Sequence, residues 1–370
     1  MKKSINLLLA GVLAGAMLLT GCNAKPTGGI APQGGNQQNT QSQAPAAKIG
    51  IVLTTSGKGD KSYNDAAIAG LDKLKAETGI TYKEIQPKEV ADIEKSLEFL
   101  AKESYDLVFT IGFNAATALK NVAEKYPTTK FVIIDYNYGN EIPANVKSIV
   151  FKEQEGSYLG GVLAAGMTKS MTVGFVGGME SPSIQKFEMG YTAGVKDTNA
   201  DVQVLSSYIS ADATGFNNPT RAKEITLDMI NKGADIIYYA AGGSGLGVLE
   251  ATSENGIKAI GVDSNQNWIK PGQMYASVTK RVDVAITDCI NQFVAGTMEV
   301  GITEVRGLAE EGVGLTDLNN LTVEETDGIS EADQKLIQDL KNSIPAEVKS
   351  QIDTASAGII DGSIVVPFAK

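Results

Sequence analysis

The sequence contains no histidine. Without an imidazole there is no Ser-His-Asp or Cys-His arrangement for nucleophilic catalysis and no zinc site that uses histidine. Most hydrolase and metalloenzyme classes are therefore excluded. We expect no catalytic residues, no metal ion and no cofactor.

Cysteine is scarce as well, with only Cys22 and Cys289 in the chain. Cys289 lies beside Ile286 and Ile290 in an expected helix, which favours a buried small apolar side chain over a nucleophile. A disulfide within one chain would have to use Cys22.

Long hydrophobic runs are limited to residues 5–19, and no second run approaches the ~18 apolar residues of a membrane-spanning helix. The net charge is -11, from 32 basic and 43 acidic residues, and no basic cluster occurs. This balance argues against nucleic acid and against anionic lipid as electrostatic partners. We expect a water-soluble body.

The N-terminus has the pattern of a secretory signal. Lys2 and Lys3 precede the apolar run, which ends at Leu19-Thr20-Gly21-Cys22, a sequence similar to a bacterial lipobox. This pattern predicts a signal peptide over residues 1–21 and acylation of Cys22 by diacylglycerol, and several acyl chains anchor a protein stably. The alternative is an ordinary signal peptide that contains a cysteine by chance.

Residues 22–47 are interpreted as the lipid anchor and a flexible linker. The stretch from residue 23 is rich in Gly, Gln, Asn, Pro, Ala and Thr and has a single charge, so it buries too little apolar surface to fold. We therefore expect an extracytoplasmic protein held at the cell membrane only by its lipid. Which membrane, in a cell with two, is left open.

The body from Lys48 onward is longer than a single core usually holds, and it alternates short β-branched runs with helical segments. This alternation predicts an α/β fold of two lobes, each with a doubly wound parallel sheet. We expect residues 48–152 plus 280–312 in lobe 1 and residues 153–279 plus 313–370 in lobe 2. The expected strands are 48–54, 80–85, 106–111, 131–135 and 148–151, then 172–176, 202–208, 235–240, 258–262 and 273–278. Two weak helices and an apolar run at 364–366 end the chain, and their place is left open.

Polar and aromatic residues follow the expected strands. In open parallel sheets ligands bind beyond the carboxyl ends of the strands, so these residues are the candidates for a binding site. Aromatic faces suit a flat ring, and amides and carboxylates suit the edge of a polar, neutral ligand. The candidate ligand-binding residues are Asp60, Tyr63, Asn64, Asp135, Phe216, Gly243, Asp263 and Lys280.

Competing interpretations exist for several of these residues. Asp60 and Ser62 suit the capping of the helix that follows them. The glycines from Gly243 lack the dinucleotide spacing G-x-G-x-x-G because Val248 takes the last glycine position. Asp135 and Asp263 also suit a carboxylate pair for glycoside cleavage, if they lie at the right distance.

Five segments together resemble the basic membrane protein family of lipid-anchored substrate-binding proteins of ABC transporters, many of which bind purine nucleosides. The segments are Asp60-Lys-Ser-Tyr-Asn-Asp, Phe151-Lys-Glu-Gln-Glu-Gly-Ser-Tyr-Leu-Gly-Gly, Val173-Gly-Phe-Val-Gly-Gly-Met, Ala240-Ala-Gly-Gly-Ser-Gly-Leu-Gly-Val and Ile260-Gly-Val-Asp-Ser-Asn-Gln. The resemblance implies a type I periplasmic-binding-protein fold with the ligand in a hinged cleft between two lobes.

Roles for the candidate residues follow from the same resemblance. It implies that Asp60 and Asn64 lie near the base, with Tyr63 where the family commonly has Phe. Asp135 and Asp263 would be polar contacts, the latter to the ribose hydroxyls. Lys280 is similar to the family's lysine that reaches the sugar, and Phe216 would be the aromatic residue from the second lobe. One departure is Asn265, where the family usually has Asp.

The sequence therefore predicts a receptor that binds a purine nucleoside such as inosine, guanosine or adenosine and delivers it to an ABC permease. It would work as a monomer, and the lobes would close on the ligand. Alternatives are a sugar or signalling-molecule receptor of the same fold, a nucleoside hydrolase that uses Asp60, Asp135 or Asp263, and a surface antigen without a ligand.

Overall fold

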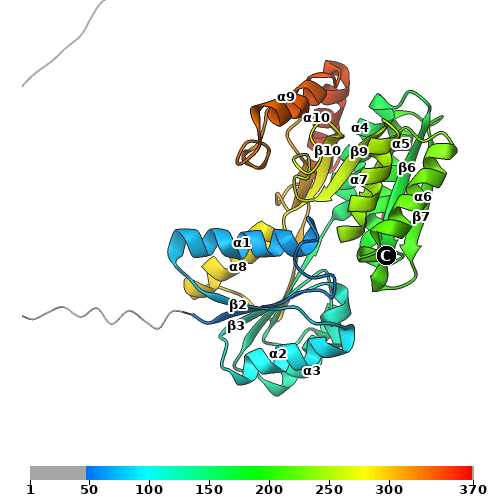
Figure 1. Cartoon of the computed structure of the whole chain (residues 1–370). Coiled ribbons are helices and arrows are strands. Elements are labelled where there is room, and N and C mark those ends of the chain that lie inside the picture. Colours follow the sequence, from blue (N-terminus) through cyan, green and yellow to red (C-terminus); the bar gives the residue numbers. More distant parts are fainter. Residues whose placement is uncertain (1–46, 369–370) are drawn as a thin grey trace, which may run out of the picture. The chain divides into compact units, whose positions relative to one another are not determined.

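The structure is a computed structural model that describes residues 47–368, so the predicted signal peptide, Cys22 and nearly all of the linker lie outside the described residues. Two six-stranded sheets organise the described chain (Figure 1), with strand orders β11-β5-β4-β3-β1-β2 and β12-β10-β9-β8-β6-β7. Every strand pairing is parallel except that of β10 with β12. We call the two sheets, with the helices that pack on each, lobe 1 and lobe 2.

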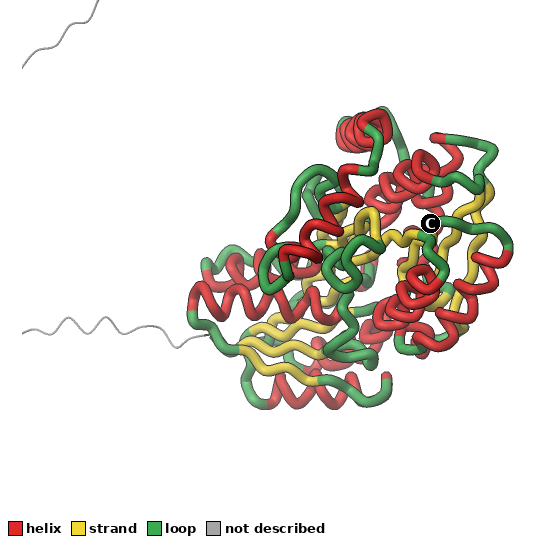
Figure 2. Tube along the Cα trace, turned by 45° about the horizontal axis from the view of Figure 1, so that its top comes forward, coloured by secondary structure: helices red, strands yellow, loops and turns green. Residues whose placement is uncertain are grey.

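Lobe 1 has helices on both faces of its sheet. Its strands are β1 (Ile49–Val52), β2 (Tyr82–Ile85), β3 (Leu107–Ile111), β4 (Lys130–Ile134), β5 (Val146–Phe151) and β11 (Ile302–Arg306). Its helices are α1 (Tyr63–Thr78), α2 (Ile93–Lys102), α3 (Ala116–Lys125) and α8 (Val282–Val294). Figures 1 and 2 show α1 and α8 on one face and α2 and α3 on the other. Side chains alternate between the two layers along each strand: Ile51 belongs to the core on the α1 side and Val52 to that of α2 and α3.

Lobe 2 repeats this plan. Its strands are β6 (Thr172–Met179), β7 (Gln203–Ser210), β8 (Ile236–Ala240), β9 (Lys258–Asp263), β10 (Met274–Lys280) and β12 (Val313–Leu315). Its helices are α4 (Glu153–Met167), α5 (Pro182–Thr198), α6 (Pro219–Asn231), α7 (Gly245–Glu254), α9 (Glu331–Asn342) and α10 (Ala346–Ile360). Phe175 of β6 contacts the ring of Tyr191 on α5, while the adjacent Gly174 faces Met229 of α6, so α5 and α6 cover opposite faces.

Local sequence explains several of the element boundaries. Gly79 ends α1 in the left-handed conformation, with its N–H bonded to the Lys75 carbonyl. Helix α5 begins after Ser181, whose hydroxyl accepts the Ile184 N–H, and Pro182 takes the first helical position. Strands β11 and β12 were not predicted. Both are short edge strands whose positions are mostly only partly buried, so their own pattern carries little signal.

The chain passes between the two sheets three times within the described residues. The passages lie between β5 and α4, between β10 and α8, and between β11 and β12. Each sheet therefore contains strands from both halves of the sequence. The passages lie close together, because the Lys152 N–H bonds to the Arg306 carbonyl at 2.9 Å and the Arg281 N–H to the Gly312 carbonyl at 2.8 Å. The lobe boundaries inferred from the sequence remain a prediction.

Candidate functional site

A cavity lies between the carboxyl ends of the strands of the two lobes. It encloses about 710 Å³ of empty space, which includes the part open to solvent. Its lining residues come from both lobes. They are Thr54, Thr55, Ser56, Asp60, Tyr63, Asn64, Gly112, Phe113, Asn114, Asp135, Ser183, Ile184, Phe187, Ala213, Phe216, Ala240, Gly242, Val262, Asp263 and Lys280.

The structure brings seven of the eight candidate residues to this one cavity: Asp60, Tyr63, Asn64, Asp135, Phe216, Asp263 and Lys280. Gly243 does not line it, and Gly242 takes its place in the wall, with φ at 53°. The backbone of Gly243 still lies close by, because a Cβ there would come 3.4 Å from the Phe216 carbonyl oxygen. A contact of Gly243 itself with a ligand stays a prediction.

Asp60 caps helix α1, as the competing interpretation of the sequence held. Its carboxylate accepts the backbone N–H groups of Ser62, Asn64 and Asp65 at 2.9 to 3.1 Å, and the Asn64 amide at 2.8 Å. Asn64 also accepts the Thr54 N–H at 3.0 Å. These bonds use both oxygens of Asp60, so its first role is to build the wall. Ser62 does not cap the helix with its side chain.

Asp135 and Asp263 occupy equivalent places in the two lobes, because each stands at the carboxyl end of a central strand with positive φ, 71° and 65°. Such a conformation is uncommon outside glycine and is tolerated best by Asp and Asn. It turns each carboxylate out of its sheet at the cavity. Across the lobes, the Ser62 hydroxyl donates to Asp263 Oδ2, and Lys280 Nζ donates to Asp135 Oδ2 at 2.5 Å.

Lys280 is enclosed almost completely, with a side chain 2% exposed. Its ammonium also donates to Glu153 Oε1 at 3.0 Å. Three aromatic rings lie around Nζ, with centroids at 5.1, 5.2 and 5.7 Å for Tyr63, Phe151 and Phe187, a distance at which cation–π attraction acts. Burial acts to lower the pKa of Lys280, but Asp135, Glu153 and Asp263 outweigh it and raise the pKa above its ordinary value. Lys280 is therefore a fixed positive charge.

Two polar atoms at this point have no hydrogen bond: the Tyr63 hydroxyl and Asp135 Oδ1. Burial and the neighbouring Asp135 carboxylate raise the pKa of Tyr63, so its phenol stays protonated. Burial also raises the pKa of Asp135, although Lys280 opposes the effect. The Tyr63 hydroxyl and the Asp135 carboxylate also lie near enough to attract each other. Because buried polar groups in proteins are nearly always bonded, a ligand that enters here can bond to both groups.

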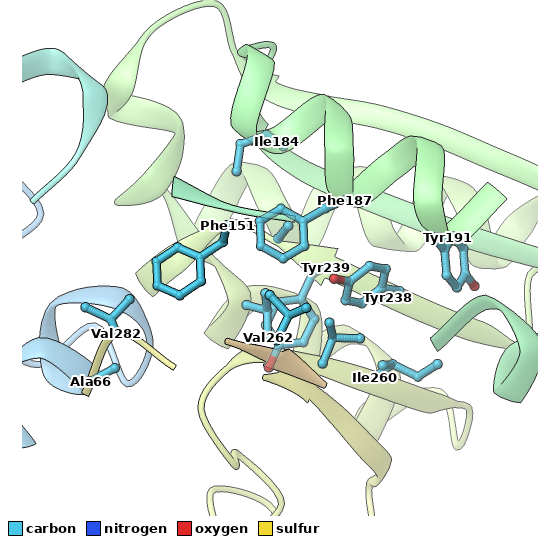
Figure 3. Close-up of a cluster of buried hydrophobic side chains, with 14 of the residues drawn as sticks. Ala66, Phe151, Ile184, Phe187, Tyr191, Tyr238, Tyr239, Ile260, Val262 and Val282 are labelled. Atoms are coloured by element: carbon cyan, nitrogen blue, oxygen red, sulfur yellow. The ribbon is translucent and has the colours of Figure 1, made fainter. Parts of the chain in front are cut away.

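Aromatic side chains from both lobes line the cavity. Tyr63 and Phe113 come from lobe 1, and Phe187 and Phe216 come from lobe 2. Gly178 leaves room for Phe216, since a Cβ at 178 would lie 2.4 Å from its ring. Figure 3 shows Phe187 and Phe151 beside each other at the edge of the buried cluster that continues to Tyr238 and Tyr239. Flat rings from two sides suit a planar ligand.

The Bmp family, described as "ABC transporter substrate-binding protein PnrA-like", matches residues 47–349. The chain belongs to the Bmp family. An uncharacterized lipoprotein of Pyrococcus horikoshii is 35% identical, over 87% of this chain and 79% of the relative. Basic membrane protein A of Borreliella afzelii is 32% identical, over 84% of this chain and 89% of the relative.

Solved structures agree with the family assignment. The crystal structure of an ABC transporter solute-binding protein from Aeropyrum pernix K1 has a TM-score of 0.77 and 29% sequence identity, covering 87% of this chain and 94% of that one. The predicted family and the two-lobed periplasmic-binding-protein fold are therefore confirmed. Members of the Bmp family are substrate-binding proteins of ABC transporters and not enzymes, so the hydrolase alternative falls.

The Bmp relatives named above also bear on the membrane. The Pyrococcus relative is named a lipoprotein. In the described part of this chain, residues 47–368, no helix is both long and apolar enough to cross a bilayer.

Sequence reasoning missed several residues of this Bmp site. Glu153 and Lys186 complete the charge cluster, with Lys186 Nζ 3.0 Å from Glu153 Oε2, and Ser62 supplies the bond to Asp263. None of them follows a strand directly. Glu153 does lie in the segment from Phe151 that contributes to the family resemblance, at the first passage between the lobes. That segment was the one signal in the sequence that could have indicated its role.

Asn265, the departure from the usual family residue, lies outside the cavity lining. Its Nδ2 donates to Thr322 Oγ1 at 2.8 Å, and its Oδ1 accepts the Asn267 N–H. The next residue, Gln266, reaches across the lobes and donates to the Lys61 carbonyl at 2.7 Å. Residue 265, for which the resemblance implies Asp, therefore makes a loop contact and does not line the cavity.

Proposed function

We propose that this substrate-binding protein captures a purine nucleoside in the cavity between its lobes and presents it to its ABC permease. The observation that carries the proposal is the combination of aromatic side chains from both lobes with two buried polar atoms that lack a close hydrogen bond, the Tyr63 hydroxyl and Asp135 Oδ1. A purine offers a planar face and an edge of donors and acceptors. The ribose hydroxyls offer donors to Asp263, in agreement with the family resemblance.

The charge of the cavity supports a ligand without phosphate. Among the described lining residues the charged side chains are Asp60, Asp135, Asp263 and Lys280. Lys280 is already paired with two carboxylates, so no cation is free to receive an anion. A nucleoside fits this wall, and a nucleotide would be repelled by it.

A ligand panel tests the proposal directly. Calorimetric titration with inosine, guanosine, adenosine, ribose and galactose is expected to show binding by at least one of the nucleosides, and mass spectrometry of copurified small molecules is expected to find one. Binding of ribose or galactose alone would favour the sugar receptor. No binding and no copurified ligand would favour the surface antigen.

Substitution of Asp263 tests the assigned ribose contact. Asp263→Ala is expected to weaken nucleoside binding about 10- to 100-fold, because a hydrogen bond to a charged group is worth about 1.5–3 kcal/mol. Asp353→Ala, at an exposed position of α10, is the matched control and should bind like the wild type. A folded Asp263→Ala protein with wild-type affinity would show that Asp263 does not contact the ligand.

We further propose that acylated Cys22 holds the receptor at the membrane. The support is the lipobox-like sequence together with the lipoprotein name of a relative. Metabolic labelling with a radioactive fatty acid should mark the wild-type chain and leave Cys22→Ala unlabelled. Equal labelling of both chains would contradict the proposal.

A further inference from the structure

The Lys280 ammonium joins three chain segments that are distant in sequence. Lys280 ends β10, Asp135 follows β4 of lobe 1, and Glu153 is the first residue of α4. The side chains of Lys280, Asp135 and Glu153 are 2%, 8% and 1% exposed. Glu153 does not line the ligand cavity, so it does not belong to the binding wall itself.

Glu153 is held in place independently of Lys280. Its Oε1 also accepts the Ser183 hydroxyl at 2.9 Å, and its Oε2 accepts Lys186 Nζ at 3.0 Å. Lys186 is fixed in turn by a bond of 2.8 Å to the Phe151 carbonyl. Burial acts to raise the pKa of Glu153, but Lys280 and Lys186 outweigh it and lower the pKa, so the carboxylate is charged. Glu153 is thus a rigid, negative anchor beside the passage between lobes.

The position of the ammonium decides what remains of Asp135 for a ligand. With one N–H on Glu153 and one on Asp135 Oδ2, Lys280 leaves Oδ1 without a hydrogen bond. An ammonium without the Glu153 anchor would be free to approach both oxygens of Asp135, since a lysine is a point charge on a flexible stem. Both acceptor positions of Asp135 would then be used within the protein.

We propose that Glu153 is a positioning residue for ligand recognition: it draws the Lys280 ammonium onto one oxygen of Asp135 and so keeps the other oxygen available to the ligand. The residue acts through Lys280 and touches no ligand. If Glu153 acted only by direct repulsion of Asp135, the opposite outcome would be expected. Removal of the Glu153 charge would then favour the ionised form of Asp135 and improve ligand binding.

The binding test uses guanosine as the probe and rests on the proposed function in that respect. Glu153→Gln should weaken guanosine binding at least about fivefold, while Glu153→Asp, which keeps the charge, should stay within about threefold of the wild type. Glu155→Gln is the matched control, in the same turn of α4, and its carboxylate is instead bonded to the Leu308 N–H and paired with Lys152. It should change affinity less than twofold.

A double-mutant cycle separates positioning from general damage. In Asp135→Asn the amide oxygen is expected to face the Lys280 ammonium, which donates to Asp135 Oδ2 in the wild type, and the NH2 group then replaces the open acceptor. Glu153→Gln should therefore cost less than twofold further in the Asp135→Asn background. Equal losses in both backgrounds, or a Glu153→Gln protein that binds like Glu155→Gln, would overturn the proposal. So would a Glu153→Asp protein that binds worse than Glu153→Gln.

A ligand-free measurement decides the matter even if guanosine does not bind, an outcome that would count against the proposed function alone. Each single variant leaves Lys280 one hydrogen-bonded carboxylate, whereas the double variant leaves a buried ammonium with none and only the more distant charge of Asp263. The drop in melting temperature of the double variant should therefore exceed the sum of the two single drops. Simple addition would show that Glu153 does not hold Lys280 against Asp135 and would overturn the proposal.

Discussion

Among the described residues, two buried lysines, Lys280 and Lys341, are paired with carboxylates that are buried as well, and they serve different regions. Lys341 of α9 is 0% exposed and donates to Glu325, also 0% exposed, at 2.6 Å, and to the Asn320 carbonyl at 2.7 Å. Lys280 is 2% exposed and joins Asp135 to Glu153. The Lys341 cluster lies within lobe 2, while the Lys280 cluster joins both lobes.

Burial and ion pairing do not by themselves distinguish the two clusters. Each contains a carboxylate oxygen without a hydrogen bond, Glu325 Oε1 and Asp135 Oδ1. The difference is that Asp135 and Lys280 line a cavity together with aromatic side chains, whereas Glu325 sits inside a capping box with Thr322 and does not line that cavity. An unbonded atom indicates a ligand only where there is space for one.

The largest effect is expected from breaking the Lys341 cluster. Lys341→Ala leaves the Glu325 carboxylate buried without its partner, which typically costs about 3–5 kcal/mol of unfolding free energy. Affinity for a ligand should not change in the folded fraction, because Lys341 does not line the cavity. Urea unfolding measures the first quantity and titration the second.

The control for this prediction lies on the same helix. Lys335 forms an exposed ion pair with Asp339, and such pairs contribute little, so Lys335→Ala should be indistinguishable from the wild type. A Lys341→Ala protein that is as stable as Lys335→Ala, or that loses ligand binding while folded, would show that the two buried lysines do not differ in role.

The Asp263 carboxylate gives a second, smaller effect with the opposite sign on stability. Burial raises the pKa of Asp263 to about 6, against the lowering influence of Lys280 and Ser62, while an unfolded Asp titrates near ~3.9. The folded state therefore holds the extra proton between about pH 6 and 4, and acidification through that range favours folding. At pH 7 the ionised carboxylate destabilises the ligand-free fold.

Asp263→Asn tests this sign. It should raise the unfolding free energy at pH 7 by up to about 3 kcal/mol, and the gain over the wild type should shrink as the pH falls to about 4. Ligand affinity of the wild type should fall as the pH drops through about 6, because a protonated Asp263 loses an acceptor. A gain that is the same at pH 7 and pH 4 would contradict the shifted pKa.

The sequence predicted the parts of this site that depend on chain order. Parallel strands end at one edge, so Asp135 and Asp263, each directly after a strand, were expected to meet at a cavity, and they do. The strand and helix alternation likewise predicted two parallel sheets, because β-branched runs and helical periods are local signals. Strands β11 and β12 escaped this reasoning, since an edge strand is specified by its partner more than by its own residues.

The rest of the site depends on packing between segments, which a single sequence does not encode locally. Glu153 stands in the first turn of α4 and Lys186 in the second turn of α5, where charged residues are ordinary. They become a cluster only because the two helices pack together beside Lys280. Gly242 lines the cavity and Gly243 does not, a difference of one residue within a turn. The periodicity of a sequence does not resolve such a difference.

The smallest effect is expected at Asn265, which connects the neighbourhood of Asp263 to that of the Lys341 cluster. Its amide donates to Thr322 Oγ1, and Thr322 caps the turn that contains Glu325. Asn265→Asp restores the usual family residue, and the Thr322 hydroxyl can then donate to the new carboxylate. Guanosine affinity should change less than about threefold and the unfolding free energy by less than about 1 kcal/mol, the size of one neutral hydrogen bond. Titration and urea unfolding of the single variant measure both quantities.

A tenfold change in affinity without a change in stability would contradict this prediction. It would show that residue 265 acts on ligand binding and not on the Lys341 cluster, so the two regions would not be independent there.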